Sequence, residues 1–524
     1  MKKEFRCLLL LAMSVANSHF ALADDPGNIV SGQAPMKTAG NIISDFPQER
    51  LITQIGNVRF ENTDILISGP NGLDLSYHSI ISAKGILSSG QPQIHLFDEN
   101  LKDHNRNQAQ CFPDYTKLSV LFAKSDLKIA GFNASSDSPS STLYNYDDNS
   151  ILKCEGSIPI VQRPNGLKYY FEYGFESYID DGKKKKVYTP YKVEDHFGNW
   201  ITFDNHFPAT SPYTSITYDE RSDGQRIYKK TRPYTFPDGD TGSIYEVSAN
   251  NRVFKYYKNE IGLVEKIIDP IGRETVFEYG SGTGLNNVIL KITTPQKLVA
   301  EYHYAPEFDN GGLRLINPDN PLGIDLGFTS GRLTGKTISG PGIEPREWLY
   351  YQGGSSRGSV KFISIEYNKD GETDVVDEYR FASALEKNGL LLSFKRYAGT
   401  FPQNHNQNID YLNFPVIYSE ETSYSQINTA DYGCDIEGST AANSVFFNCE
   451  RYRPTLKTTT VKKSDGIDSY FEKYEDYDSY GNARKVTLYS SAQINKKRHI
   501  KYQFLNDKIN WLIGLPRKTS ISTD

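Results

Sequence analysis

Asp-Gly and Asn-Gly dipeptides punctuate the chain along most of its length. Both tolerate the positive φ that the two-residue loops of β-hairpins require. Asp-Gly stands at 181–182, 223–224, 238–239, 370–371 and 465–466, and Asn-Gly at 71–72, 165–166, 310–311 and 388–389. Between alternating segments these dipeptides are a strong hairpin signal, so the sequence predicts a succession of hairpins.

The segments beside these dipeptides alternate between apolar and polar residues, as strands with one buried face do. After Gly272, for example, Thr275, Phe277 and Tyr279 fall on one face. Tyrosine, which is favoured in strands, is the commonest aromatic residue, with Tyr 36 against Phe 27 and Trp 3. The period of two predicts an all-β fold of stacked antiparallel hairpins from about residue 50 to the end. The best candidate for a helix is the stretch from Asp377 to Glu386.

The first 23 residues have the pattern of a secretory signal peptide. Lys2, Lys3 and Arg6 precede an apolar stretch from Leu8 to Val15, and Ala21-Leu22-Ala23 gives a small-x-small cleavage pattern. The apolar stretch is shorter than the roughly 20 residues of a membrane-spanning helix, and no later segment approaches that length. We therefore expect a secreted, periplasmic or cell-surface protein without a transmembrane segment after signal removal. The alternative for this stretch is an N-terminal core helix.

Removal of the signal leaves four cysteines, an even number that predicts disulfides in an oxidising compartment. They are Cys111, Cys154, Cys434 and Cys449. Three pairings are possible, and order along the chain favours Cys111–Cys154 and Cys434–Cys449, because each then closes a local loop. A zinc site is the competing interpretation, but the sequence has no Cys-x-x-Cys pair and its histidines are scattered. We expect no metal and no cofactor.

Three segments share one local pattern, in which Asp-x-x-Gly separates two strand-like runs. They contain Asp195 and Gly198; Asp269, Pro270 and Gly272; and Asp478 and Gly481. Aspartate accepts backbone N–H bonds at the first turn position, proline presets φ at the second, and glycine supplies conformational freedom at the fourth. Each unit is a two-stranded ribbon that cannot bury its apolar face alone, so the units must stack against one another. The spacing of turns divides the chain near residue 160, into an N-terminal β region (24–160) and a repeat region (161–524).

The segments Tyr477-Asp478-Ser479-Tyr480-Gly481-Asn482 and Asp269-Pro270-Ile271-Gly272-Arg273 resemble the tyrosine–aspartate (YD) repeats of the Rhs family. Residues 55–77 are similar to the strand pair that opens many secreted Rhs proteins, and residues 506–516 resemble a stretch that precedes the main repeat array. The family includes bacterial polymorphic toxins. The resemblance implies a curved β-shell or open spiral sheet, which in that family encloses a C-terminal toxin that is released after self-cleavage.

The sequence departs from the family pattern in lacking a paired Asp-Pro-x-Gly core motif, a variable toxin tail and a long uninterrupted array. Asp269-Pro270-Ile271-Gly272 occurs once and has the form of a repeat turn, not of a protease. We expect an incomplete shell, a truncated relative, or a wall that another chain completes. The partner would be a further Rhs chain or a toxin polypeptide.

Other functions are weighed against this one. The formal net charge of −6 argues against nucleic-acid binding, which needs a basic face. The segment 354–358 matches the G-x-S-x-G nucleophile motif at Ser356, but strand-like runs flank it on both sides, so it is read as a hairpin loop. We therefore expect no catalysis, and a structural shell protein associated with a toxin or its delivery. The first alternative is a surface adhesin that binds glycans through exposed tyrosines, and the second is a hydrolase on a β scaffold.

Overall fold

The computed structural model of the chain describes residues 41–43, 48–52, 57–70, 73–81, 87–88, 93–97, 117–121, 129–132, 143–144, 150–156, 158–178, 184–204, 215–280, 287–304, 333–355, 359–367, 373–382, 390–399, 414–427, 451–463, 466–478, 480–507 and 512–524. Within these ranges the chain is almost entirely extended. Ser491–Gln493 form a 3₁₀ helix, and none of the described residues lies in an α-helix. The all-β prediction is confirmed.

The strands form two antiparallel sheets. The first, which we call the inner sheet, contains β1 (Asn41–Ile43), β2 (Glu49–Ile52), β3 (Asn57–Ile67), β4 (Leu75–Ile81) and β5 (Leu87–Ser88). The second sheet begins with β6 (Gln93–Phe97), β7 (Lys117–Leu121), β8 (Ile129–Phe132), β9 (Leu143–Tyr144), β10 (Ile151–Glu155), β11 (Ile158–Gln162), β12 (Lys168–Tyr178) and β13 (Lys184–Glu194). It continues through β14 (Trp200–Thr202), β15 (Ser215–Arg221), β16 (Arg226–Thr235), β17 (Thr241–Ala249), β18 (Arg252–Asn259), β19 (Val264–Ile268), β20 (Glu274–Tyr279), β21 (Ile289–Thr293), β22 (Val299–Tyr304), β23 (Leu333–Gly340) and β24 (Ile343–Ser355). It ends with β25 (Ser359–Tyr367), β26 (Thr373–Ala382), β27 (Leu391–Ala398), β28 (Val416–Ile427), β29 (Arg451–Lys463), β30 (Gly466–Tyr477), β31 (Ala483–Ser490), β32 (Arg498–Asp507) and β33 (Leu512–Thr523).

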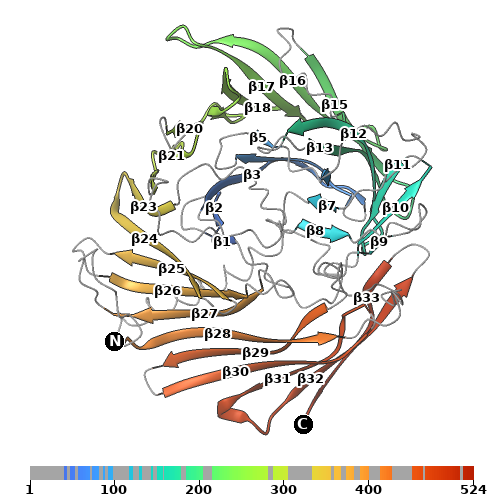
Figure 1. Cartoon of the computed structure of the whole chain (residues 1–524), viewed down its shortest axis with the longest axis vertical. Coiled ribbons are helices and arrows are strands. Elements are labelled where there is room, and N and C mark those ends of the chain that lie inside the picture. Colours follow the sequence, from blue (N-terminus) through green and yellow to red (C-terminus); the bar gives the residue numbers. More distant parts are fainter. Residues whose placement is uncertain are drawn as a thin grey trace.

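Every strand from β9 to β32 pairs antiparallel with the strand that follows it, and we call the continuous series from β9 to β33 the wall. Strand β6 joins the wall through β13, and β7 and β8 extend β6. Figure 1 shows the wall curving around the molecule from β9 to β33, with the inner sheet inside the curve. The change of sheet falls between β5 and β6, upstream of residue 160, where the spacing of turns changes. The division into domains at that residue stays a prediction.

The two ends of the wall meet. Asn165, in the turn after β11, forms a β-bridge with Leu512 of β33. The N–H of Ile513 donates a hydrogen bond of 2.8 Å to the carbonyl of Pro164. The last strand therefore contacts the beginning of the same sheet, and the curved sheet returns to its own start.

The main hydrophobic core lies between the inner sheet and the wall. Phe60 of β3 meets Phe277 of β20 edge to face, with ring centroids 5.2 Å apart. Tyr77 of β4 lies 6.1 Å from both Tyr245 of β17 and Tyr256 of β18. All five side chains are at most 4% exposed. The inner sheet is therefore the second layer against which this part of the wall buries its apolar face.

The alternation of residues along a wall strand explains which face is covered. In β18, Phe254 and Tyr256 are buried, whereas Lys255 and Tyr257 between and beside them are partly exposed. Successive side chains of a strand point to opposite faces, so one face of β18 meets the inner sheet and the other meets solvent.

The predicted helix is wrong. Asp377 to Ala382 belong to β26, which pairs with β25 on one side and β27 on the other. Val376 and Glu378, two residues apart, are both fully buried, which is the period of a strand. Glu and Arg favour helices slightly, but ladder bonds to two neighbouring strands outweigh so small a preference. Residues 383–386 lie outside the described part of the chain.

The hairpins predicted at Asp223-Gly224 and Asp238-Gly239 are present, because β15 pairs with β16 and β16 with β17, but their loops are not of the two-residue type. A type I′ loop needs a positive φ at both central residues, but only the glycines have one, at 84° and 97°. The N–H of Arg221 bonds to the carbonyl of Gln225 (2.9 Å), which encloses three loop residues. Two successive residues with positive φ (49° and 64°) occur instead at Asn250-Asn251, between β17 and β18.

Candidate functional site: the repeated turns and the seam between inner sheet and wall

The turn between β19 and β20 shows how the aspartate of the repeated pattern works. The N–H of Asp269 bonds to the carbonyl of Arg273, and the N–H of Gly272 bonds to the carbonyl of Asp269, both at 3.0 Å. Asp269 Oδ1 accepts the N–H groups of Ile271 (3.0 Å) and Arg273 (2.9 Å), and Oδ2 accepts Arg273 Nε (2.6 Å). Gly272 has a φ of 84°, which glycine adopts at no steric cost. Burial would raise the pKa of Asp269, but the hydrogen bonds and charge of its partners hold that pKa below its usual value.

The turns at Asp195 and Asp478 have the same geometry. In each, Oδ1 accepts the N–H groups of the second and fourth residues after the aspartate, all at 2.9 Å. The glycines, Gly198 and Gly481, have φ values of 86° and 78°. An asparagine stands where Arg273 stands in the first turn, and its amide returns to Oδ2 at 2.8 and 3.0 Å. The three segments with a common sequence pattern thus fold locally in one way.

Five further turns of the described chain make the same pair of backbone hydrogen bonds. They begin at Arg163, Arg221, Phe236, Asn259 and Thr294. Asn259 Oδ1 and Thr294 Oγ1 accept the N–H of the fifth residue at 3.0 and 3.1 Å, as the aspartates do. Reasoning from sequence missed them because it required Asp at the first position. Allowing Asn there would have found Asn259, but nothing in the sequence marks Lys297 (φ 62°) as the substitute for glycine.

The third residue of these turns projects at the tip, and its environment differs between turns. Phe197, Ile261 and Ile271 are 65%, 60% and 75% exposed, whereas Tyr480 is 4% exposed. The same backbone turn therefore carries an apolar side chain into solvent at three places and into a packed contact at the fourth.

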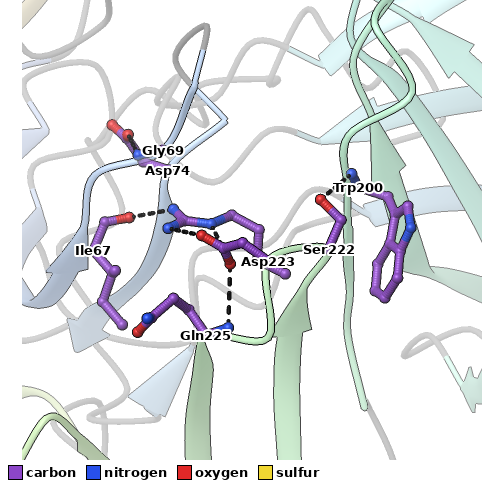
Figure 2. A network of polar contacts seen from close by, with 8 residues as sticks. Ile67, Gly69, Asp74, Trp200, Ser222, Asp223 and Gln225 are labelled. Atoms are coloured by element: carbon purple, nitrogen blue, oxygen red, sulfur yellow. Dashed lines mark hydrogen bonds and ion pairs between the residues drawn. The ribbon is translucent and has the colours of Figure 1, made fainter.

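Arg221 fastens a wall turn to the inner sheet and is itself buried. Its Nε and Nη2 bind the carboxylate of Asp223 (3.1 and 2.8 Å), and its Nη1 donates to the carbonyl of Ile67 at the end of β3 (2.8 Å). Figure 2 shows Ile67 and Asp223 on either side of this bridge, with Gly69 and Asp74 beside it. The hydrogen bond from Arg221 lowers the pKa of Asp223. A Cβ on Gly69 would lie 2.6 Å from Arg221 Nη1, so glycine lets the two segments approach.

An ion pair buried from solvent fastens the inner sheet to the opposite part of the wall. Lys336 Nζ, on β23, lies 3.2 and 3.3 Å from the two carboxylate oxygens of Glu49, on β2. Both residues are 2% exposed. Lys336 Nζ also lies 4.6 Å from the ring centroid of Trp348. A buried charge is costly without a partner, so each residue constrains the position of the other.

A third contact joins β3 to β18. The hydroxyl of Tyr256 donates to Asp64, whose Oδ1 also accepts Asn62 Nδ2 at 2.6 Å. Arg252 Nη2 donates to the backbone carbonyl of Asp64 at 3.1 Å. Burial raises the pKa of Asp64 and holds the pKa of Tyr256 well above its usual value. Polar groups from strands far apart in sequence thus pair inside the molecule, where each buried polar group needs a hydrogen-bond partner.

No group of three or more His, Cys, Asp or Glu residues within the described ranges could hold a metal ion. Ser355 ends β24, and β24 and β25 pair directly across residues 356–358. The G-x-S-x-G segment therefore joins two antiparallel strands. A nucleophile elbow, by contrast, joins a strand to a helix. Ser356 itself lies outside the described residues.

The remaining sequence predictions fall partly outside the described chain. Cys154 lies in β10 and is disulfide-bonded. Cys111, Cys434 and Cys449 lie outside the described residues, so the pairing stays a prediction, and so does the signal peptide at residues 1–23. Across the described ranges, no helix has the length and apolar character needed to cross a membrane.

No family model and no curated protein matches the chain. Among solved structures, it is similar to a chain in the crystal structure of TcdB2-TccC3-TEV (9% identity, TM-score 0.15). It is also similar to one in the crystal structure of TcdB2-TccC3-Cdc42 (10% identity, TM-score 0.17). Each match covers 86% of this chain but only 28% or 26% of the other, so this chain spans about a quarter of those chains. At these TM-scores the neighbours carry no information about what this chain binds.

Proposed function

We propose that this chain is a secreted, non-catalytic structural protein of the Rhs/YD-repeat type. Its wall would form part of a shell associated with a toxin or with toxin delivery. One observation carries the proposal: a single turn geometry recurs along a continuous sheet that curves back to its own beginning. Repetition of one hairpin unit is how a chain builds a long curved wall, because each unit supplies the edge on which the next one pairs.

The contacts of the inner sheet support a mechanical role. Glu49, Asp64 and Ile67 bind wall residues on three different strands, which holds the curved sheet at a fixed spacing from the layer inside it. The charged side chains at these contacts are buried and paired, and their pairing fixes the position of the inner sheet against the wall. Such a wall acts by separating the space on its inner side from solvent, and the partner would be a toxin polypeptide or a further Rhs chain.

Protection from protease tests this proposal. The DNA beside the gene would first be read for a continuing repeat array, a toxin tail and an immunity gene. The tail polypeptide encoded there would then be co-expressed with this chain and treated with trypsin. We expect the tail to survive with the intact chain and to be digested with Lys336→Met, which breaks a contact between inner sheet and wall. Absence of any such tail gene, or digestion at one rate with and without this chain, would overturn the association with a toxin.

A glycan-binding surface is the second candidate, and one feature of the outer face favours it. Tyr218 and Tyr228 face each other across β15 and β16, with ring centroids 6.0 Å apart, and are 40% and 43% exposed. The guanidinium of Arg226 lies 4.6 Å from the Tyr218 ring. A glycan array would decide: binding lost with Tyr218→Ala and Tyr228→Ala, and kept with Phe197→Ala, would favour an adhesin.

A further inference from the structure

A lysine and an aspartate lie in contact inside the main core, on adjacent strands of the wall. Asp219 belongs to β15 and Lys229 to β16, and Lys229 Nζ is 2.5 Å from Asp219 Oδ1. Their side chains are 4% and 6% exposed. Ile227 is paired with Asp219 and Val247 with Lys229 across neighbouring strands, and both apolar residues are fully buried members of the main core. Directly paired residues share a face of the sheet, so the ion pair lies on the inner face of the wall.

The backbone of Asp204 binds both members of the pair. Its N–H donates to Asp219 Oδ1 at 3.2 Å, and its carbonyl accepts a hydrogen bond of 2.9 Å from Lys229 Nζ. The carbonyl therefore helps to hold the amine against the carboxyl group. The N–H polarises the carboxyl oxygen that the amine contacts, as the donors of an oxyanion hole do.

The apolar surroundings disfavour two opposite charges at this place. Burial raises the pKa of Asp219 by more than the charge of Lys229 lowers it. Charges in a protein interior are costly even when they are paired. Transfer of one proton from the ammonium group to the carboxylate removes both charges and leaves a neutral amine beside a neutral carboxylic acid. These are the two forms that condense to an amide.

We propose that Lys229 and Asp219 condense to an isopeptide bond that crosslinks β15 to β16. The lone pair of Nζ attacks Cγ of the carboxylic acid and forms the C–N bond. Oδ2 then leaves as water, with the carboxyl proton and one proton of the amine. Oδ1, which accepts the N–H of Asp204, becomes the oxygen of the amide. The step uses only groups of this chain and needs no oxidant, reductant or cofactor.

Two properties of the site favour the bond. The reacting groups are held in contact, and the effective molarity of well-oriented intramolecular reactions can reach about 10⁵–10⁸ M. Both groups are also buried, so the water that is released leaves for the solvent and the amide is protected from hydrolysis.

Two other ion pairs of the wall lack this combination. Lys463 and Asp468 are hydrogen-bonded across β29 and β30, but their side chains are 47% and 26% exposed. The hydrogen bond with Asp468 raises the pKa of Lys463, which keeps that amine protonated and without a lone pair. Lys336 Nζ lies 3.2 and 3.3 Å from the two oxygens of Glu49, as in an ion pair in which one ammonium group serves both oxygens.

The bond closes a loop around one of the turns that fasten the wall to the inner sheet. The loop, residues 219–229, contains Arg221, which donates to the carbonyl of Ile67. Like a disulfide, a crosslink of this kind restricts the unfolded chain and keeps the two strands together when their hydrogen bonds break. The inference goes beyond the proposed function, because the bond forms whatever the wall encloses.

Peptide mapping of the full chain tests the bond. The purified protein would be denatured, reduced and digested with trypsin, which does not cut after a lysine that is acylated at Nζ. We expect one branched peptide, residues 193–221 joined to 227–230, lighter by one water molecule than the two peptides together. Fragmentation should place the link between Asp219 and Lys229. Recovery of residues 193–221 and 227–229 only as separate peptides would overturn the proposal.

Lys229→Arg is the matched variant, because arginine keeps the charge that pairs with Asp219 but has no nucleophilic amine. In intact-mass spectra, the variant should be heavier than the unchanged protein by the difference between arginine and lysine plus one water molecule. A difference without that water would contradict the bond. The exposed pair is the internal control, and the peptides that contain Lys463 and Asp468 should be recovered unlinked. A link between them as well would show that the condensation does not depend on burial, and would overturn the argument.

Discussion

At the scale of the residue, turns with the same backbone hydrogen bonds should differ in how much their aspartates contribute to stability. Asp269 and Asp478 accept the same backbone hydrogen bonds, but the turn at Asp269 is exposed and the turn at Asp478 is buried. Water can replace a lost acceptor only in the first case. The cost of losing the aspartate should therefore follow burial and not the local motif.

We expect Asp478→Ala to lower the free energy of unfolding by about 3 kcal/mol, because it leaves buried donors of the turn and of Asn506 without an acceptor. The matched change Asp269→Ala should cost about 1 kcal/mol or less. Denaturant titration of the two variants measures both values. Equal losses would mean that the motif, and not its burial, sets the cost.

The pKa of Lys258 gives a prediction about pH. Lys258 Nζ lies 4.9 Å from the ring centroid of the buried Tyr245, and none of the described carboxylates forms an ion pair with it. Burial lowers its pKa to about 8. An unfolded lysine has a pKa of about 10.4, so between these values the unfolded chain binds more protons and the stability contributed by this group rises with pH.

We therefore expect Lys258→Met to stabilise the protein at pH 7 and to remove a rise in stability between pH 8 and 9.5. The window stops there because burial raises the pKa values of tyrosines such as Tyr245, whose effect on stability above about pH 10 has the opposite sign. Lys266→Met is the control, since Lys266 also lies 4.9 Å from a tyrosine ring but pairs with Glu274 at an exposed position. Denaturation midpoints would be measured across this window for both variants. The expectation would be contradicted if the midpoints of Lys258→Met and Lys266→Met changed equally with pH.

At the scale of the element, sequence alone predicts strands well and loops less well. The alternation that placed Phe277 and Tyr279 on one strand is a property of neighbouring residues, and the strand β20 is where it predicted. The dipeptide Asp223-Gly224 does not decide the type of loop. Whether one or two loop residues have a positive φ depends on where the flanking strands stop pairing. The strand at Asp377 is decided by its neighbours β25 and β27, which no local pattern reveals.

The ion pair between β2 and β23 carries the prediction at this scale. Lys336→Met should cost about 3–5 kcal/mol, because it leaves the carboxylate of Glu49 buried without this partner. Adding Glu49→Gln should recover part of the loss by removing the uncompensated charge. As a control, Lys291→Met loses only exposed pairs, with Glu278 and Glu301, and should cost less than about 1 kcal/mol. Thermal melts of these three variants and of Glu49→Gln alone would contradict us if the double change lost as much as the sum of its two single changes.

At the scale of the whole molecule, the position of the inner sheet could not be predicted. The hairpin pattern shows that ribbons must stack, but it contains nothing that pairs Phe60 with Phe277 or Glu49 with Lys336, which lie more than 200 residues apart. The contact between Tyr480 and Ile513 was hidden for the same reason, since the sequence pattern gives Tyr480 the same turn position as Phe197 and Ile271, which the structure shows to be exposed. Long-range packing depends on how far the wall curves, and that is the sum of many small twists.

The dependence of the wall on the layer inside it gives the last prediction. Phe60→Ala should cost about 3–5 kcal/mol, as the removal of a buried phenylalanine ring usually does. Because Phe60 belongs to the core that covers β17, β18 and β20, hydrogen exchange should rise in those strands. It should not rise in β30–β32, whose described residues do not belong to that core. Phe197→Ala, at an exposed turn tip, should change neither stability nor exchange. A uniform rise along the wall after Phe60→Ala would mean that the wall unfolds as one unit, and that the inner sheet does not stabilise one part of it selectively.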